Sequence, residues 1–177
     1  MNQFKIRQLT SFHDVSFEEF WQIYSESFPL CERRDYEQQV AVLNDPGYEL
    51  DIYFLEEKLS GFISYWKSDE FVFVEHLAIS PDYRDKGLGT AILKPFSERQ
   101  SVPVILEIEL PVDQITTRRL RFYESLGFIT NPHIHFQPPF HVGDNPLPLN
   151  ILTYPDTISN YLYNRFSQFQ KKIMSKL

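Results

Sequence analysis

The sequence predicts an α/β fold built on a mixed, mostly antiparallel sheet with helices on both of its faces. Three observations lead to this class. Three strand-like runs follow one another between residues 48 and 79, strand-like and helix-like segments alternate from residue 71 to residue 128, and amphipathic helices are expected near both ends. Consecutive strands favour antiparallel pairing, whereas strand–helix–strand order favours a parallel crossover. A mixed sheet accommodates both.

The composition indicates a single domain spanning residues 1–177. The chain is 42% hydrophobic and 16% aromatic, which is enough for one packed core. A formal net charge of −7 argues against a nucleic acid or an anionic membrane as the partner and favours a cationic or amine-bearing one. With one cysteine, Cys31, and neither an apolar leader nor a membrane-length apolar run, we expect a cytoplasmic protein.

An edge strand and two helices are predicted in the first 47 residues. Residues 4–10 alternate apolar and polar side chains, as a strand does. Ser16 and Glu19 form a capping-box pattern, and aromatic residues then recur at helical spacing as far as Phe28. Asp35 is expected to cap a second helix that ends at the turn 44–47. Its buried side should carry Tyr36, Val40 and Leu43.

The remaining elements follow from the same patterns. A meander of three strands is predicted, with a short turn near Glu57 and Lys58. Pro95 should kink or shorten the helix that follows, and Gly127 should end the next one. Residues 129–150 give no clear prediction. The predicted ranges are 48–57, 59–66 and 71–79 for the meander, 89–99 (helix), 102–110 (strand), 115–128 (helix), 149–154 (strand) and 156–177 (C-terminal helix, periodic over 156–175).

The stretch YRDKGLG, residues 83–89, predicts an anion site. Gly87 and Gly89 allow positive φ and close approach of a ligand to main-chain N–H groups at the start of a helix, where the helix dipole adds positive charge. Arg84 and Lys86 add cations. A turn that merely starts the helix is the alternative. A P-loop is excluded because no Gly-Lys-Ser or Gly-Lys-Thr follows, and a dinucleotide fingerprint is a weak rival because Ile92 replaces its third glycine.

The run HLAISPDYRDKGLGTAIL resembles the signature of the GNAT superfamily of N-acetyltransferases, and RFYESLGF, residues 121–128, is similar to its late helix. The segments SFPLCERRDYEQQ, QPPF and PLPLNILTYP resemble an uncharacterised bacterial branch of that superfamily. The resemblance implies acetyl-CoA as co-substrate, two splayed central strands, direct transfer to an amine, and no metal. It assigns coenzyme binding to Leu77, Ala78, Ile79, Arg84, Asp85, Lys86, Gly87, Leu88, Gly89, Thr90 and Thr116. Thr116 stands where the family often has Asn, and Arg119 where it often has Ala.

Three residues are candidates for catalysis. The family motif places the hydroxyl of Tyr123 near the coenzyme sulfur as the acid that protonates the thiolate; a core tyrosine is the alternative. An amine with a pKa near 10.4 must lose a proton before attack. Glu75, the first candidate for the base, lies in an apolar strand, where its alternative is a buried ion pair with an arginine or a hydrogen bond to a neighbouring tyrosine. Glu107, the second, stands where some relatives carry a base; its alternative is a solvent-facing strand end.

Other polar residues receive plainer interpretations. We expect His133, His135 and His141 to line the acceptor cleft or the surface; a metal site with Asp144 is the alternative. His76 should point away from Glu75 as a core residue. Arg33 and Arg34 are expected on a solvated helix face.

The sequence therefore predicts an acetyl-CoA-dependent N-acetyltransferase with a small-molecule or peptide amine as acceptor, and a homodimer is possible. A non-catalytic CoA-binding regulatory or interaction module is the competing class. A dinucleotide-binding protein is a weaker alternative.

Overall fold

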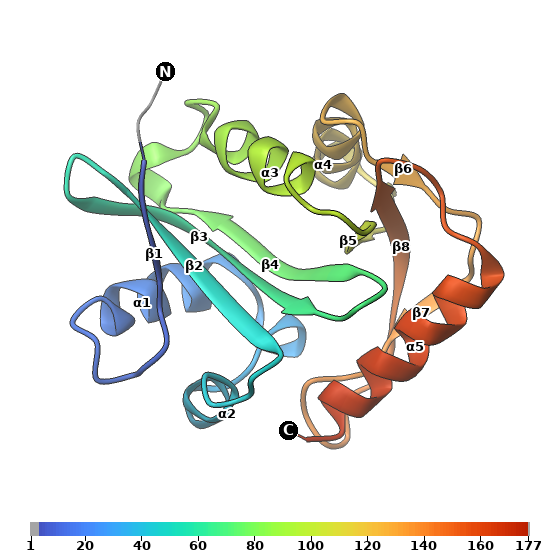
Figure 1. Cartoon of the computed structure of the whole chain (residues 1–177), viewed down its shortest axis with the longest axis horizontal. Coiled ribbons are helices and arrows are strands. Elements are labelled where there is room, and N and C mark those ends of the chain that lie inside the picture. The colour runs from blue at the N-terminus through green and yellow to red at the C-terminus, as the bar shows by residue number, and fades with distance from the viewer. Residues whose placement is uncertain (1–3, 177) are drawn as a thin grey trace. The chain divides into compact units, whose positions relative to one another are not determined.

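The computed structural model describes residues 4–176, which form an α/β fold with mostly antiparallel strand pairing, as predicted (Figure 1). None of the helices in this part of the chain is long and apolar enough to cross a membrane. The strands are β1 (Lys5–Gln8), β2 (Tyr48–Leu55), β3 (Lys58–Lys67), β4 (Val72–Ile79), β5 (Val104–Glu109), β6 (Ile129–Thr130), β7 (His135–Gln137) and β8 (Leu147–Tyr154). The helices are α1 (Phe17–Ser27), α2 (Tyr36–Val42), α3 (Leu88–Glu98), α4 (Gln114–Ser125), α5 (Asn160–Met174), and the 3-10 helices η1 (Leu30–Glu32) and η2 (Pro81–Tyr83).

The chain divides into two compact units. Unit 1 comprises the chain through Lys67 together with Val74–Pro95, and unit 2 comprises Ser68–Phe73 together with the chain from Phe96 onward. The single-domain organisation and the splay of two central strands stay predictions.

The predicted meander is formed by β2, β3 and β4 in this order, and β1, the predicted edge strand, pairs with β2. Tyr48 lies opposite Trp66 in the register of β2 and β3. The turn between these strands lies at Glu56 and Glu57, one residue earlier than predicted, and both residues have positive φ, 52° and 63°. Such a turn matches the right-handed twist of a hairpin.

Helices cover both faces of the unit 1 strands. Adjacent β3 residues point to opposite faces. Phe62 packs edge-on against Phe20 of α1, with ring centroids 4.8 Å apart. A Cβ added at Gly61 would meet Ile92 of α3 at 3.4 Å, so α3 lies on the other face. Figure 1 shows α1 and α3 on opposite sides of these strands.

The two helix caps predicted in unit 1 have different outcomes. The capping box of α1 is not formed, because Ser16 makes no cap hydrogen bond with its side chain and its Oγ instead accepts from Arg7 at 2.6 Å. Arg7 also binds the carboxylate of Asp14. The cap of α2 is confirmed: the carboxylate of Asp35 accepts from the main-chain N–H of Gln38 at 2.8 Å.

Two other helix predictions need correction. Pro95 does not shorten α3, which continues to Glu98. The buried residues of α2 are Gln39 and Val42 and not Tyr36, Val40 and Leu43. Burial of Gln39 is tolerated because its carboxamide donates to the hydroxyl of Tyr48 at 3.1 Å.

Unit 2 is organised around β8. Leu149 pairs with both Glu109 of β5 and His135 of β7, so these strands flank β8 on opposite edges. The segment without a clear sequence pattern thus holds two short strands, β6 and β7. Phe166 of α5 packs edge-on against Phe71, with ring centroids 5.8 Å apart, which anchors the C-terminal helix.

Candidate functional site

The loop before α3 is exposed and has the backbone of an anion site. Gly87 has a φ of +76° and open space where a Cβ would lie, so a ligand has access to the main chain there. Asp85 also has positive φ, 59°. The N–H of Ala91 donates to the carbonyl of Gly87, so the N–H groups of Leu88 and Gly89 precede the first bond inside the helix. These two main-chain N–H groups can donate hydrogen bonds to an anion.

The side chains of Arg84 and Lys86 bind oxygen atoms that carry no formal charge. Arg84 donates to the carbonyl of Ile79 at 3.1 Å and to the hydroxyl of Ser27 at 3.4 Å. Lys86 donates to the carbonyl of Asp82 at 2.7 Å. Within residues 4–176 neither side chain is paired with a carboxylate. The loop can therefore offer positive charge to a phosphate group.

The end of β4 lies close to β3. A Cβ added at Gly61 would come within 2.7 Å of the carbonyl oxygen of Ala78, a distance that real Cβ atoms do not show. Glycine is therefore required for this approach. Ile79 follows Ala78 on β4, and its main-chain carbonyl accepts a hydrogen bond from the Arg84 side chain. This bond joins the end of β4 to the loop before α3.

Glu75 forms a buried ion pair with Arg34, which is the alternative that the sequence offered for this residue. The guanidinium donates to its two carboxylate oxygens at 2.5 and 2.9 Å, and both side chains have 0% exposed surface. Trp66 donates to the same carboxylate at 3.2 Å. Burial by itself would raise the pKa of Glu75, but the charge of Arg34, the nearby His76 ring and the hydrogen bonds from Arg34 outweigh it and lower the pKa to about 2.

Arg34 does not lie on a solvated helix face, so that expectation is wrong for this residue. Tyr24 fixes its backbone, because the Arg34 main-chain N–H donates to the Tyr24 hydroxyl at 3.0 Å. The guanidinium also lies over the ring of Tyr48, 5.5 Å from its centroid. The signal was present in the sequence: a carboxylate inside the apolar run of Glu75 requires a cation, and arginine is the cation best suited to a buried pair.

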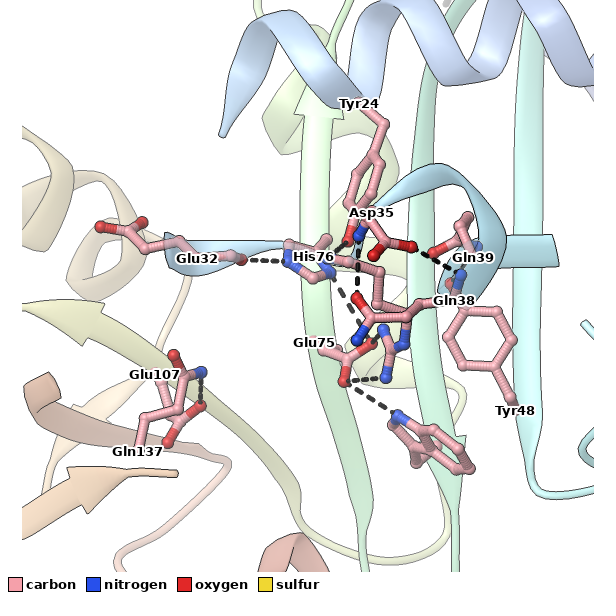
Figure 2. Close-up of polar contacts among 12 residues, drawn as sticks. Tyr24, Glu32, Asp35, Gln38, Gln39, Tyr48, Glu75, His76, Glu107 and Gln137 are labelled. Carbon is pink, nitrogen blue, oxygen red and sulfur yellow. Dashed lines mark hydrogen bonds and ion pairs between the residues drawn. The ribbon is translucent and has the colours of Figure 1, made fainter. Parts of the chain in front are cut away.

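His76 does not point away from Glu75, because its Nδ1 lies 3.7 Å from the Glu75 carboxylate (Figure 2). Its Nε2 is 2.9 Å from the carbonyl oxygen of Glu32, and its ring packs edge-on against Tyr24. The side chain is buried. A core role for His76, the other part of the prediction, agrees with these contacts.

Glu107 belongs to a second buried polar cluster, in unit 2, and does not lie at a solvent-facing strand end. Its carboxylate accepts from His135 Nε2, from Gln137 Nε2 at 2.7 Å, and from Gln170 Nε2 at 2.7 Å (Figure 2 shows the Gln137 bond). Sequence patterns did not indicate Gln137 or Gln170. His135 is buried and does not lie on the surface.

Tyr123 lies on α4 beside aromatic side chains. Its ring packs edge-on against Phe122 and Phe128, with centroids 5.1 and 6.0 Å away. Burial raises the pKa of Tyr123 to about 12, so the hydroxyl is protonated at neutral pH. In the part of the chain that the structure describes, this hydroxyl makes no hydrogen bond. A free O–H group of this kind can donate to a ligand.

Thr116 has its hydroxyl engaged in the cap of α4. The hydroxyl accepts from the main-chain N–H groups of Val112 and Asp113, both at 3.1 Å, and donates to the carboxylate of Asp113 at 2.8 Å. Arg119, the other departure from the family pattern, pairs with Glu109. These bonds favour a structural role for both side chains.

The histidines of the segment 133–141 are not arranged as metal ligands. His135 contacts Glu107, and His133 stacks on the ring of Tyr163 with centroids 4.1 Å apart. Among residues 4–176, no group of three or more His, Cys, Asp or Glu side chains is placed to hold a metal ion. Cys31 is exposed.

Known proteins share this architecture and sequence pattern. The model of the acetyltransferase (GNAT) family matches residues 15–128. "Putative acetyltransferase YjbC" of Bacillus subtilis (strain 168) is 34% identical over 107 residues, 59% of this chain and 53% of that protein, so the match spans about half of its length. A solved "Putative acetyltransferase from GNAT family" of Bacteroides thetaiotaomicron is 30% identical, with a TM-score of 0.83 over 98% of this chain and 95% of its own. The structure of yncA from Salmonella typhimurium with its cofactor acetyl-CoA shares the fold, with a TM-score of 0.60, 20% identity, and coverage of 89% and 96%.

Proposed function

Because the chain belongs to the acetyltransferase (GNAT) family, we propose that it transfers the acetyl group of acetyl-CoA directly to a primary amine. The observation that carries the proposal is the loop of Arg84–Thr90, where a positive-φ glycine and helix N–H groups meet two cations that have no carboxylate partner among residues 4–176. This combination fits the pyrophosphate of coenzyme A, which carries two negative charges about one group.

The parts of the coenzyme would be held by different groups. Main-chain groups at Gly87, Leu88 and Gly89 would bind the pyrophosphate, with Arg84 and Lys86 adding charge. Main-chain groups of Leu77–Ile79 would bind the pantetheine arm. The coenzyme supplies an activated thioester, and the protein supplies position and proton transfer. Thr116 is the weakest member of the predicted set because its hydroxyl is already used in a helix cap.

Tyr123 would donate to the sulfur that leaves. Its pKa of about 12 keeps the hydroxyl protonated at neutral pH, and its hydroxyl has no competing partner in residues 4–176. A thiolate with a pKa near 8.5 is a good acceptor of such a bond. We expect Tyr123→Phe to lower kcat by about 10²-fold without weakening acetyl-CoA binding. Phe122→Leu, in the neighbouring position, is the control for changed packing on α4.

For the proton of the amine, the contacts favour Glu107 over Glu75. Glu75 is paired with a permanent cation, which lowers its affinity for a proton. The partners of Glu107 are two carboxamides and an imidazole, none of which carries a fixed charge. The net charge of −7 favours a cationic amine as the acceptor substrate but does not select a particular compound.

The test is transfer to a panel of amines: a polyamine, an aminoglycoside, a peptide with a free N-terminus and a peptide with an internal lysine. Release of the coenzyme thiol and the mass of the product are measured together. Acetylation of at least one amine by wild type, reduced in Tyr123→Phe, supports the proposal. Tight binding of acetyl-CoA without acetylation of any amine would favour the competing function, a CoA-binding regulatory or interaction module.

A further inference from the structure

Gly61 of β3 is buried at a point where two other elements of unit 1 come close to it. A Cβ on its backbone would lie 2.7 Å from the carbonyl oxygen of Ala78, 3.0 Å from Cδ1 of Ile79 and 3.4 Å from Cδ1 of Ile92. The first two atoms belong to the end of β4 and the third belongs to α3. The φ of Gly61 lies outside the left-handed region, so glycine is required here for space and not for backbone conformation.

The three contacts differ in their ability to yield to a larger residue. The Cδ1 atoms of Ile79 and Ile92 are the ends of flexible side chains, which can turn to another rotamer. The carbonyl of Ala78 is main chain, so it moves only if β4 moves with it. The next part of β4 is bonded to β3, because the N–H of Ser80 donates to the carbonyl of Ser60 at 3.0 Å. A larger residue in place of the glycine would therefore displace the main chain at the end of β4.

The end of β4 is the part of unit 1 that the proposed function uses for the pantetheine arm, through main-chain groups of Leu77–Ile79. Two of its carbonyl groups have fixed neighbours: that of Ala78 lies against Gly61 of β3, and that of Ile79 accepts from Arg84 Nε at 3.1 Å. Main-chain groups that bind a ligand through hydrogen bonds bind it more tightly when they are already in place, because less ordering is needed on association. The position of this strand end therefore bears on the affinity for the coenzyme.

We infer that Gly61 is a positioning residue for acetyl-CoA. By leaving room for the Ala78 carbonyl, it sets the place of the β4 main chain that binds the pantetheine arm. It acts through Ala78, and the inference requires no contact between Gly61 and the coenzyme. The inference rests on the proposed function, which supplies the ligand of this strand. It adds to the site a residue of β3 that lies outside both the run HLAISPDYRDKGLGTAIL and the segment RFYESLGF.

Steady-state kinetics of Gly61→Ala test the inference with an amine that wild type acetylates. KM for acetyl-CoA should rise by about 10-fold, the effect of one lost main-chain hydrogen bond to the arm, while KM for the amine stays within about twofold. A variant that is merely less stable loses active protein, which lowers kcat and changes neither KM. Calorimetry gives the matching dissociation constant for acetyl-CoA in the absence of turnover.

Two further variants identify the atom that causes the effect. Gly47→Ala is the matched control, because a Cβ there would meet side-chain atoms of Asp45 and Trp66 at 3.5 Å, an ordinary contact distance, and it should leave both KM values unchanged. Gly61→Ala combined with Ile79→Val removes the Cδ1 that crowds the new methyl group but keeps the contact with the carbonyl. Compared with Ile79→Val alone, this double variant should still show the raised KM for acetyl-CoA, although denaturant unfolding should show it to be more stable than Gly61→Ala.

Amide hydrogen exchange in wild type tests the same point without any substitution, and it decides the case in which Gly61→Ala does not fold. The Ser80 amide reports how firmly β3 holds the end of β4, because it is bonded to Ser60. We expect this amide to be protected in the free protein and its exchange rate to change by less than about threefold when acetyl-CoA binds. A large gain in protection on binding would mean that the coenzyme and not β3 orders this strand end, and would overturn the inference.

The outcomes separate the inference from the proposed function. An active wild type beside a folded Gly61→Ala variant with an unchanged KM for acetyl-CoA would overturn the inference and leave the transferase standing. Restoration of that KM by Ile79→Val would also overturn it, because crowding of a side chain would then be the cause. A wild type that binds acetyl-CoA but acetylates no amine would overturn the transfer step alone, since the dissociation constants still test Gly61. Failure of wild type to bind acetyl-CoA would overturn both.

Discussion

Two glutamates lie buried on strands of this protein, and their partners differ in one decisive respect. Glu75 of unit 1 is held by Arg34, whose charge is permanent. Glu107 of unit 2 is held by His135 and two glutamines, none of which carries a permanent charge. Glu75 accepts hydrogen bonds from the side chains of Arg34 and Trp66, and Glu107 accepts them from three side chains, yet only the partners of Glu75 include a permanent cation.

The difference shows that burial alone does not identify a catalytic carboxylate. A buried carboxylate beside a guanidinium stays ionised. Glu75 of β4 binds Trp66 of β3 and Arg34, which lies between η1 and α2 and is bonded to Tyr24 of α1, so the carboxylate contributes to holding these segments together. The partners described for the Glu107 carboxylate include no permanent cation. The four predictions that follow test this contrast, beginning with the largest effect.

The largest effect is expected from removal of the Arg34 charge. Arg34→Met leaves the Glu75 carboxylate buried without its cation, which should lower the free energy of unfolding by about 3–5 kcal/mol. Denaturant unfolding measures the change. Arg165→Met, which breaks an exposed pair with Glu70, is the control and should cost less than about 1 kcal/mol. Equal losses in the two variants would contradict the structural importance of the buried pair.

Acid should weaken the Glu75 pair next. The pKa of Glu75 is about 2 in the folded chain against an ordinary 4.5, so between these values the unfolded chain binds more protons. The stabilisation is complete above about pH 5 and is lost as the pH falls toward 2, a change of roughly 3 kcal/mol. The double variant Arg34→Met with Glu75→Leu should show a flatter dependence of unfolding free energy over this range. An unchanged slope would rule out Glu75 as its source.

Glu107→Gln should act on activity more than on the fold. The amide cannot take up the proton of the amine, so kcat/KM with a competent amine should fall by about 10²-fold. Glu109→Gln, two residues along the same strand, serves as the control and should retain most of the activity. Steady-state kinetics with thermal unfolding of both variants make the comparison. Full activity in Glu107→Gln would remove Glu107 from the proton path.

The smallest effect is expected for a neutral donor of the second cluster. Gln170→Met removes one hydrogen bond to Glu107 while two others remain, and should destabilise the protein by about 1–2 kcal/mol. Denaturant unfolding measures the loss beside that of Arg34→Met. A loss as large as that of Arg34→Met would mean that the charge of the partner is not what separates the two clusters.

Local sequence patterns predicted the parts of the molecule whose cause is local. The meander, the Asp35 cap and the glycine loop each depend on residues within a few positions of one another. Ser16 failed as a cap because Arg7, which lies in β1, takes its hydroxyl. That competition depends on how β1 and the following loop pack together, and no spacing rule contains it.

The polar clusters were harder to predict because they join distant segments. Arg34 and Glu75 are 41 residues apart, and Gln170 lies 63 residues from Glu107. The apolar strand around Glu75 indicates that its carboxylate needs a cationic partner, but it does not indicate which of the neighbouring arginines supplies the charge. It gave no sign that Tyr163 of the C-terminal helix would reach His135, because a tyrosine at that position also fits an ordinary amphipathic helix.

The central claim is that the loop before α3 binds acetyl-CoA, and calorimetry tests it with two matched glycine variants. Gly87 and Gly143 both have positive φ, 76° and 94°, and open space for a Cβ, so Gly87→Glu and Gly143→Glu impose similar backbone strain. We predict micromolar binding by wild type and by Gly143→Glu, and none by Gly87→Glu. A folded wild type that does not bind acetyl-CoA, or a Gly87→Glu variant that binds it as well as Gly143→Glu does, would contradict the account.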